Sequence, residues 1–102
     1  MSPAAYLDLH AGDLTGLLRR LVNFPTINPP GAHYEGITAL LTRELRSLGL
    51  ATKRFTISRA QLRRRLPAAQ WAFPRYNVLG KLAVPGAKKT IHFNAHYDVV
   101  PV

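Results

Sequence analysis

His96 and Asp98 are the residues whose types and spacing most clearly could do chemistry. They follow the segment 90–95, whose composition is typical of a strand. Residues i and i+2 of an extended chain project from one face about 6 to 7 Å apart, so the two side chains should point the same way. Such a pair suits a metal-binding imidazole with a carboxylate that orients it or acts elsewhere in the same site. The same pattern also fits polar residues that have no functional role and stand where a strand leaves a sheet.

Few other side chains could complete a metal site. The chain has no cysteine, which excludes thiolate ligands, cysteine nucleophiles and disulfides. Its four histidines and five carboxylates are scattered along the sequence. His92 shares the parity of His96, but four extended residues separate the two by more than about 12 Å, too far for one metal ion. We therefore interpret His92 as a sheet histidine, and we expect no closed metal site from this chain alone.

Two amphipathic helices are predicted in the first half of the chain. Apolar residues at i, i+3, i+4, i+7 and i+8 predict a helix over 14–22, with Asp13 as its N-cap. A second apolar stripe predicts a helix over 34–48, and Gly49 is the stop signal directly after it. Between the helices, three prolines and a glycine in segment 23–31 predict an ordered or semi-ordered loop.

A small sheet is predicted in the second half. Alternating patterns indicate strands over 50–58, 76–84 and 89–95, and a turn at 85–88 makes the last two a β-hairpin in the simplest interpretation. Segment 59–75 is predicted to be a short helix followed by a loop. The first strand should be half exposed to water, because a lysine interrupts its apolar face, which consists of Ala51, Lys53, Phe55 and Ile57.

Length and charge narrow the class of protein. With 102 residues and 47% hydrophobic content, the chain can form one domain and is not wholly disordered. It has neither a signal-peptide pattern nor a long apolar run, so the cytoplasm is the default and no membrane partner is expected. A net charge of +9 raises nucleic acid or an anionic lipid as partner. Segment 59–75 combines arginines with Trp71 and Phe73, but we favour an exposed insertion whose aromatic residues pack on the domain.

Three motifs occur in a definite order along the chain. They are Pro25-Thr26-Ile27-Asn28-Pro29-Pro30-Gly31, Arg75-Tyr76-Asn77-Val78-Leu79-Gly80 and Asn94-Ala95-His96-Tyr97-Asp98-Val99-Val100-Pro101. With them, the sequence from about Asp13 to Val102 resembles the N-terminal part of the zinc aminoacylase and carboxypeptidase family. That family includes acetylornithine deacetylase and succinyl-diaminopimelate desuccinylase. The last of the three motifs is the most specific.

The resemblance implies roles for two residues. His96 would be the first ligand of a two-zinc site, in which other divalent metals could substitute, and Asp98 would be the adjacent catalytic carboxylate that supports it. The family's other ligands, its general base and a dimerisation domain all follow this point, so the full-length protein could form a homodimer. Two zinc ions cannot be held by one His and one Asp, since a catalytic zinc ordinarily has three protein ligands.

We therefore expect an α/β fold with two amphipathic helices on a small mixed or antiparallel sheet. Residues 1–12 would be an N-terminal extension, and residues 13–102 would be the first, incomplete part of a zinc-hydrolase catalytic domain. The complete enzyme would hydrolyse the amide bond of an N-acyl amino acid or a peptide, whereas this chain alone should be inactive. Its last strand should leave unpaired edges and exposed apolar surface. The alternative is a small basic module that binds nucleic acid or an acidic partner.

Overall fold

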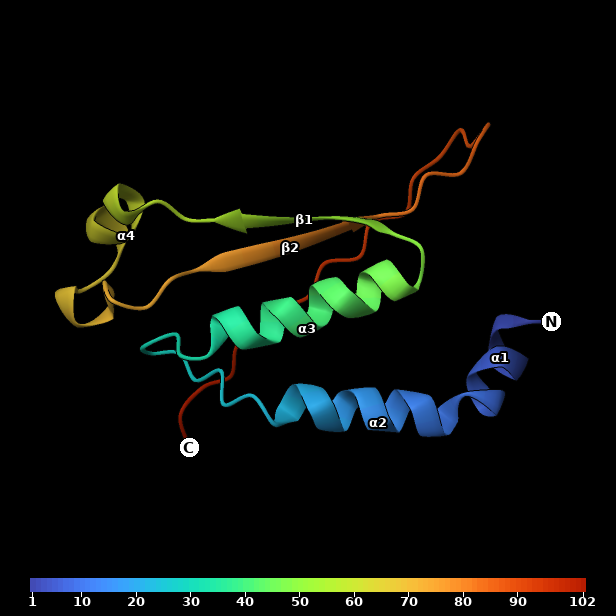
Figure 1. Cartoon of the computed structure of the whole chain (residues 1–102), viewed down its shortest axis with the longest axis horizontal. Coiled ribbons are helices and arrows are strands. Elements are labelled where there is room, and N and C mark those ends of the chain that lie inside the picture. The colour runs from blue at the N-terminus through green and yellow to red at the C-terminus, as the bar shows by residue number, and fades with distance from the viewer.

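A two-stranded antiparallel sheet with one helix across it forms the centre of the fold (Figure 1). In the computed structural model, which describes residues 1–102, β1 (Ala51–Thr56) pairs with β2 (Tyr76–Lys81). Helix α3 (Tyr34–Ser47) packs on both strands. The chain is therefore a small mixed α/β structure, as the sequence predicts.

Helix α3 ends where its sequence signals predict. Ile37 and Leu40 are buried on the side of the helix that faces the sheet, and Leu48 is its C-cap. Gly49 follows with a φ of +87°, the left-handed conformation that glycine adopts without a Cβ penalty. The apolar stripe and this stop signal together fix both the face and the length of the helix.

In each strand, one set of alternate residues faces α3. Gly80 of β2 approaches Leu45 so closely that an added Cβ would lie 3.1 Å from its Cδ1. Opposite Gly80 in the register, Thr52 accepts a 2.8 Å hydrogen bond from Arg46 Nε of α3. The parity of Phe55, which the sequence marks as the apolar one, is therefore the exposed face. Only Thr52 of β1 is partly buried, so the strand is more open than the half exposure that the sequence predicts.

Two helices precede the loop at 23–31. Helix α1 (Pro3–Leu9), capped by Ser2, leads almost directly into α2 (Ala11–Val22). The prediction that Asp13 is the N-cap is wrong, because the helix begins two residues earlier. Asp13 lies in the first turn, with its carboxylate 2.8 Å from Nδ1 of His10.

Helix α2 lies beside α3, which separates it from the sheet in Figure 1. An ion pair of 2.7 Å between Arg20 and Glu44 joins the two helices. No residue of α2 is buried, so its apolar stripe is largely open to solvent. No helix of the chain combines the length and apolar character that a membrane crossing requires.

Segment 59–75 forms the predicted short helix and loop. Helix α4 (Arg59–Arg65) begins after Ser58, whose side chain accepts a hydrogen bond from the Gln61 amide at 3.2 Å. A single 3-10 turn, η1 (Ala68–Gln70), follows and leads back to β2.

The predicted third strand does not form, and the hairpin prediction is wrong. The turn at 85–86 is present, closed by a 3.1 Å bond from the Ala87 amide to the Val84 carbonyl, but residues 88–95 pair with no strand. Ile91 is 80% exposed and Phe93 is 89% exposed. Alternation of apolar residues specifies an extended chain that suits a sheet face, but it does not specify a partner. The segment instead forms an arm beyond β2 and runs back toward the C-terminus (Figure 1).

Candidate functional site

The proline-rich loop after α2 holds the segment that contains His96 and Asp98. Ile27 and Val99 form a parallel bridge. The amide of Asn28 donates to the carbonyl of Val99 at 2.8 Å, and the amide of Val99 donates to the carbonyl of Thr26 at 2.9 Å. The stiffness that prolines give this loop therefore serves to present a short pairing edge.

A buried threonine adds a third connection between these two segments. Oγ1 of Thr26 donates to the carbonyl of Tyr97 at 2.7 Å, and its side chain is fully enclosed. The backbone of Tyr97 is thereby fixed between the two residues of interest. The positions of His96 and Asp98 thus depend on a loop about seventy residues earlier in the chain, the separation between Asn28 and Asp98.

The structure brings the side chains of His96 and Asp98 into direct contact. Nδ1 of His96 lies 2.9 Å from Oδ1 of Asp98 and 3.1 Å from the carbonyl oxygen of the same residue. Both neighbours are acceptors, so Nδ1 carries a proton, and in the neutral ring Nε2 keeps its lone pair. The His96 side chain is 86% exposed, and that of Asp98 is 35% exposed. The Nε2 atom of His96 is therefore accessible and oriented so that it could bind a metal ion.

The second oxygen of the carboxylate is held by an asparagine. Nδ2 of Asn28 donates to Oδ2 of Asp98 at 3.1 Å. This bond is the main reason that the pKa of Asp98 lies below its ordinary value; hydrogen bonding to His96 lowers it further and partial burial opposes both. Asp98 is therefore ionised near neutral pH and acts as an acceptor toward both neighbours.

Arg75, the first residue of the second motif, forms hydrogen bonds to the proline-rich loop at 23–31. Its Nη2 donates to the carbonyl of Pro30 at 2.7 Å and to Oε1 of Gln70 at 2.9 Å. Its Nη1 donates at 3.2 Å both to Oδ1 of Asn28 and to the hydroxyl of Tyr34. A single guanidinium thus joins the proline-rich loop, the start of α3 and the segment before β2, as its planar fork of donors allows.

A chain of four side chains results: Arg75, Asn28, Asp98 and His96. Arg75 fixes the amide of Asn28, which fixes the carboxylate of Asp98, which fixes the ring of His96. Sequence reasoning placed Arg75 and Asn28 in the motifs but gave neither a role. The signal that could have found Asn28 is its position before two prolines, a stiffer arrangement than a connector requires.

Two tyrosines close the inner side of the site. The rings of Tyr34 and Tyr97 meet edge to face with centroids 4.9 Å apart, and the Tyr97 hydroxyl donates to the carbonyl of Tyr76. Burial, followed by the neighbouring Tyr34, raises the pKa of Tyr97 to about 12. Burial also raises the pKa of Tyr34. Both phenols are therefore neutral over the physiological range; the Tyr97 hydroxyl donates to Tyr76, and the Tyr34 hydroxyl accepts from Arg75.

The shifted pKa of Tyr97 predicts sensitivity to alkali. The unfolded phenol has an ordinary pKa of 10.0, below the folded pKa of about 12. The stability gained from the neutral phenol is therefore complete below pH 10 and is lost as pH rises from 10 to 12. We expect Tyr97→Phe to be less stable than the parent at pH 7 but to lose less stability between pH 9 and pH 11. Urea unfolding at both pH values measures this, and parallel curves for the two proteins would contradict it.

Other side chains that could bind a metal ion lie away from His96 and Asp98. Glu44 pairs with Arg20 and His10 with Asp13, while His92 lies on the unpaired arm. No group of three or more metal-ligating side chains exists in the chain. The residues present therefore fit one corner of a zinc site, a single imidazole with its supporting carboxylate, and do not fit a complete one.

Known proteins provide no independent assignment of this arrangement. The chain matches no protein-family model, no curated protein and no solved structure.

Proposed function

We propose that this chain supplies the first zinc ligand, His96, and its supporting carboxylate, Asp98, to a metal-dependent amide hydrolase. One observation carries the proposal: the Asp98 carboxylate accepts from Nδ1 of His96 at 2.9 Å, while Nε2 faces solvent. Histidine ligands of metal ions commonly have their second ring nitrogen held by a carboxylate in this way. The pair belongs to the third motif of the family resemblance, and Asn28 of the first motif contacts both Asp98 and Arg75 of the second.

The proposed substrate is an N-acyl amino acid or a peptide, and the proposed setting is the cytoplasm. Zinc would supply a Lewis acid and a metal-bound water of lowered pKa in the complete site. Within this chain, Asp98 fixes the tautomer and direction of the His96 ring, and Asn28 and Arg75 fix Asp98. The other ligands and the general base would come from outside these 102 residues, so the chain alone is proposed to be inactive.

Zinc titration of the chain, followed by NMR of the histidine rings, tests the ligand assignment. We expect zinc to perturb His96 before His92, because of these two rings only that of His96 has a carboxylate at Nδ1. His10 has the same arrangement with Asp13, at 2.8 Å, so the titrated protein carries His10→Ala. Binding should be weak, since one imidazole replaces the three ligands of an ordinary catalytic site. Removing the carboxylate support with Asp98→Ala should weaken zinc binding by about tenfold or more.

His92→Ala is the matched control, because it removes a histidine from the same extended segment. Zinc binding should survive this change and should be lost in His96→Ala. Equal perturbation of the three remaining histidines, or equal effects of the two alanine variants, would mean that His96 is an ordinary surface histidine. An unchanged affinity in Asp98→Ala would remove the supporting role of the carboxylate.

A further inference from the structure

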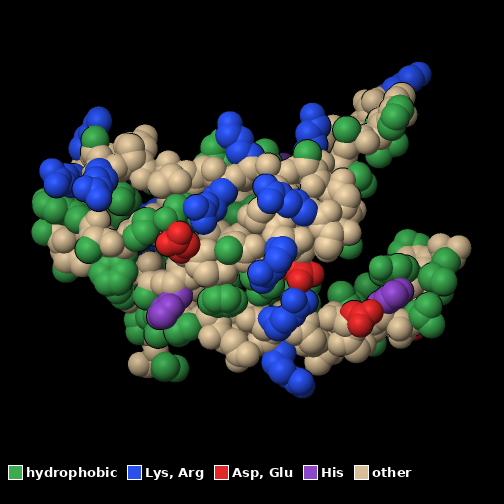
Figure 2. All heavy atoms as spheres, viewed as in Figure 1, with side chains coloured by type: hydrophobic (Ala, Val, Ile, Leu, Met, Phe, Trp, Pro, Cys, Tyr) green, Lys and Arg blue, Asp and Glu red, His purple; other side chains and the backbone are tan.

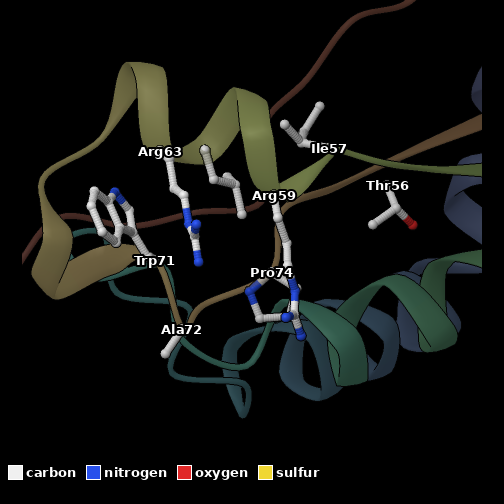
Figure 3. A pocket seen from close by; sticks show the side chains of 8 residues that line it. Thr56, Ile57, Arg59, Arg63, Trp71, Ala72 and Pro74 are labelled. Atoms are coloured by element: carbon white, nitrogen blue, oxygen red, sulfur yellow. The ribbon is translucent and has the colours of Figure 1, made fainter.

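A hollow beside α4 is lined by none of the residues of the proposed zinc site. Its volume is about 400 Å³, within the range of small-molecule sites. Figure 3 shows the side chains around it, which come from the end of β1, from α4 and from the segment before β2. The lining residues are Thr56, Ile57, Arg59, Leu62, Arg63, Trp71, Ala72 and Pro74.

Two arginines that form no ion pair and no side-chain hydrogen bond line this hollow. Arg59 and Arg63 are four residues apart on α4, so they share one face of the helix, and Figure 3 shows both extending toward the segment at Ala72 and Pro74. The three ion pairs of the chain involve other residues, and no carboxylate lines the hollow. Lys and Arg side chains also gather over α4 on the face shown in Figure 2. The hollow therefore has a net positive charge with no internal counter-ion.

The opposite wall is aromatic and fixed. The Trp71 ring is held by a 2.8 Å bond from its Nε1 to the carbonyl of Leu66, and the residue is 41% exposed. The guanidinium of Arg63 lies 5.5 Å from the centroid of this ring. The expectation that Trp71 packs down on the domain is therefore not met in full, because much of the indole is open. Leu62, which is buried, contributes an apolar wall.

We propose that this hollow binds a phosphate joined to a planar ring, as in a nucleotide or a single strand of nucleic acid. Arg59 and Arg63, which have no carboxylate partner, would hold the phosphate, and the base would stack on the Trp71 indole. An inorganic anion would leave the apolar wall and the indole unused. A neutral aromatic compound would leave both arginines without a counter-ion.

The fluorescence of Trp71 tests this proposal directly, because Trp71 is the single tryptophan of the chain. Titration with adenosine monophosphate is expected to quench it saturably, whereas adenosine and inorganic phosphate should each bind at least about tenfold more weakly. Arg63→Ala should weaken nucleotide binding by about tenfold or more. If Arg63→Ala does not fold, as judged by circular dichroism, Arg59→Gln replaces it.

Arg64→Ala is the matched control, since it removes the same charge from the same helix at an exposed position outside the hollow. Its affinity for the nucleotide should stay within about twofold of the parent. Equal weakening by Arg63→Ala and Arg64→Ala would show general charge attraction and overturn the proposal. So would inorganic phosphate that binds as tightly as the nucleotide, or the absence of any saturable quenching.

A single-stranded oligonucleotide of eight residues distinguishes the two sources of the ligand. If it binds much more tightly than the mononucleotide, with affinity that falls steeply as salt rises, the occupant is a strand. If the two bind equally per molecule, the occupant is a free nucleotide. Both outcomes support the recognition of a phosphate with a planar ring, and neither depends on zinc binding at His96.

Discussion

Replacement of Arg75 by alanine is expected to destabilise the chain by about 3 kcal/mol or more, because hydrogen bonds from a charged group to partly buried acceptors are among the stronger ones. The guanidinium serves four acceptors, on Asn28, Pro30, Tyr34 and Gln70. Without it, the proline-rich loop loses its support on the sheet side. Urea denaturation followed by far-UV circular dichroism measures the loss.

The same variant is expected to release the His96 ring, which gives a measurement that a purely structural role would not affect. In the parent, Asp98 holds the proton on Nδ1, so the ring nitrogens should show one dominant tautomer in ¹⁵N NMR spectra. Arg75→Ala should shift this ring toward a mixture of tautomers. Asn28→Ala should do the same with a smaller loss of stability, because it removes the bond to Asp98 and spares those to Pro30 and Gln70.

Arg75→Lys keeps the charge but replaces the planar fork with a single ammonium, which cannot reach all four acceptors at once. We expect its stability to lie between those of the parent and of Arg75→Ala, so it also provides the tautomer measurement if the alanine variant does not fold. Parent-like stability together with an unchanged His96 tautomer in Arg75→Ala would contradict the connection between these residues.

Substitution of Gly31 by alanine is expected to cost about 2 kcal/mol or more, because two penalties combine at this position. Gly31 has a φ of +94°, a conformation that side-chain-bearing residues rarely adopt. An added Cβ would also lie 2.5 Å from Cζ and from Nη1 of Arg75, inside the van der Waals radii. The guanidinium would have to move, and its hydrogen bonds to the loop would be lost.

Gly49→Ala separates the two penalties. Gly49 has a similar φ of +87°, but an added Cβ there would meet no atom within 4 Å. Urea unfolding of both variants should therefore show the backbone cost alone at Gly49 and a larger cost at Gly31, with a disturbed His96 tautomer only in the second. Equal losses of stability would mean that Arg75 yields without consequence.

The parts of the fold that depend on local signals could be predicted from the sequence. The apolar stripe and Gly49 set the bounds of α3, and Ser58 begins α4 where a short helix was expected. The parts that depend on partners could not. The arm at 88–95 has the alternation of a strand, but pairing needs a neighbouring edge that no local pattern specifies. Likewise, α1 leads directly into α2 and moves the helix start away from Asp13.

The candidate site divides in the same way. Contact between His96 and Asp98 follows from a spacing of two residues in an extended chain, so the sequence alone predicts that they lie together. The connection of Asn28 to Arg75 spans 47 residues, and its connection to Asp98 spans 70. Such contacts are set by how the elements pack, and only the stiffness of the proline-rich loop indicated that this segment does more than join two helices.

The long separation between Asn28 and Asp98 also makes their contact costly in chain entropy. The contacts of α3 with β1 and β2 lie within residues 34–81, so they close shorter loops. The bridge between Ile27 and Val99 must close a loop around all of them, at an entropic cost that grows with loop length. We therefore expect the orientation of His96 to be acquired after the helix and sheet that support it are in place.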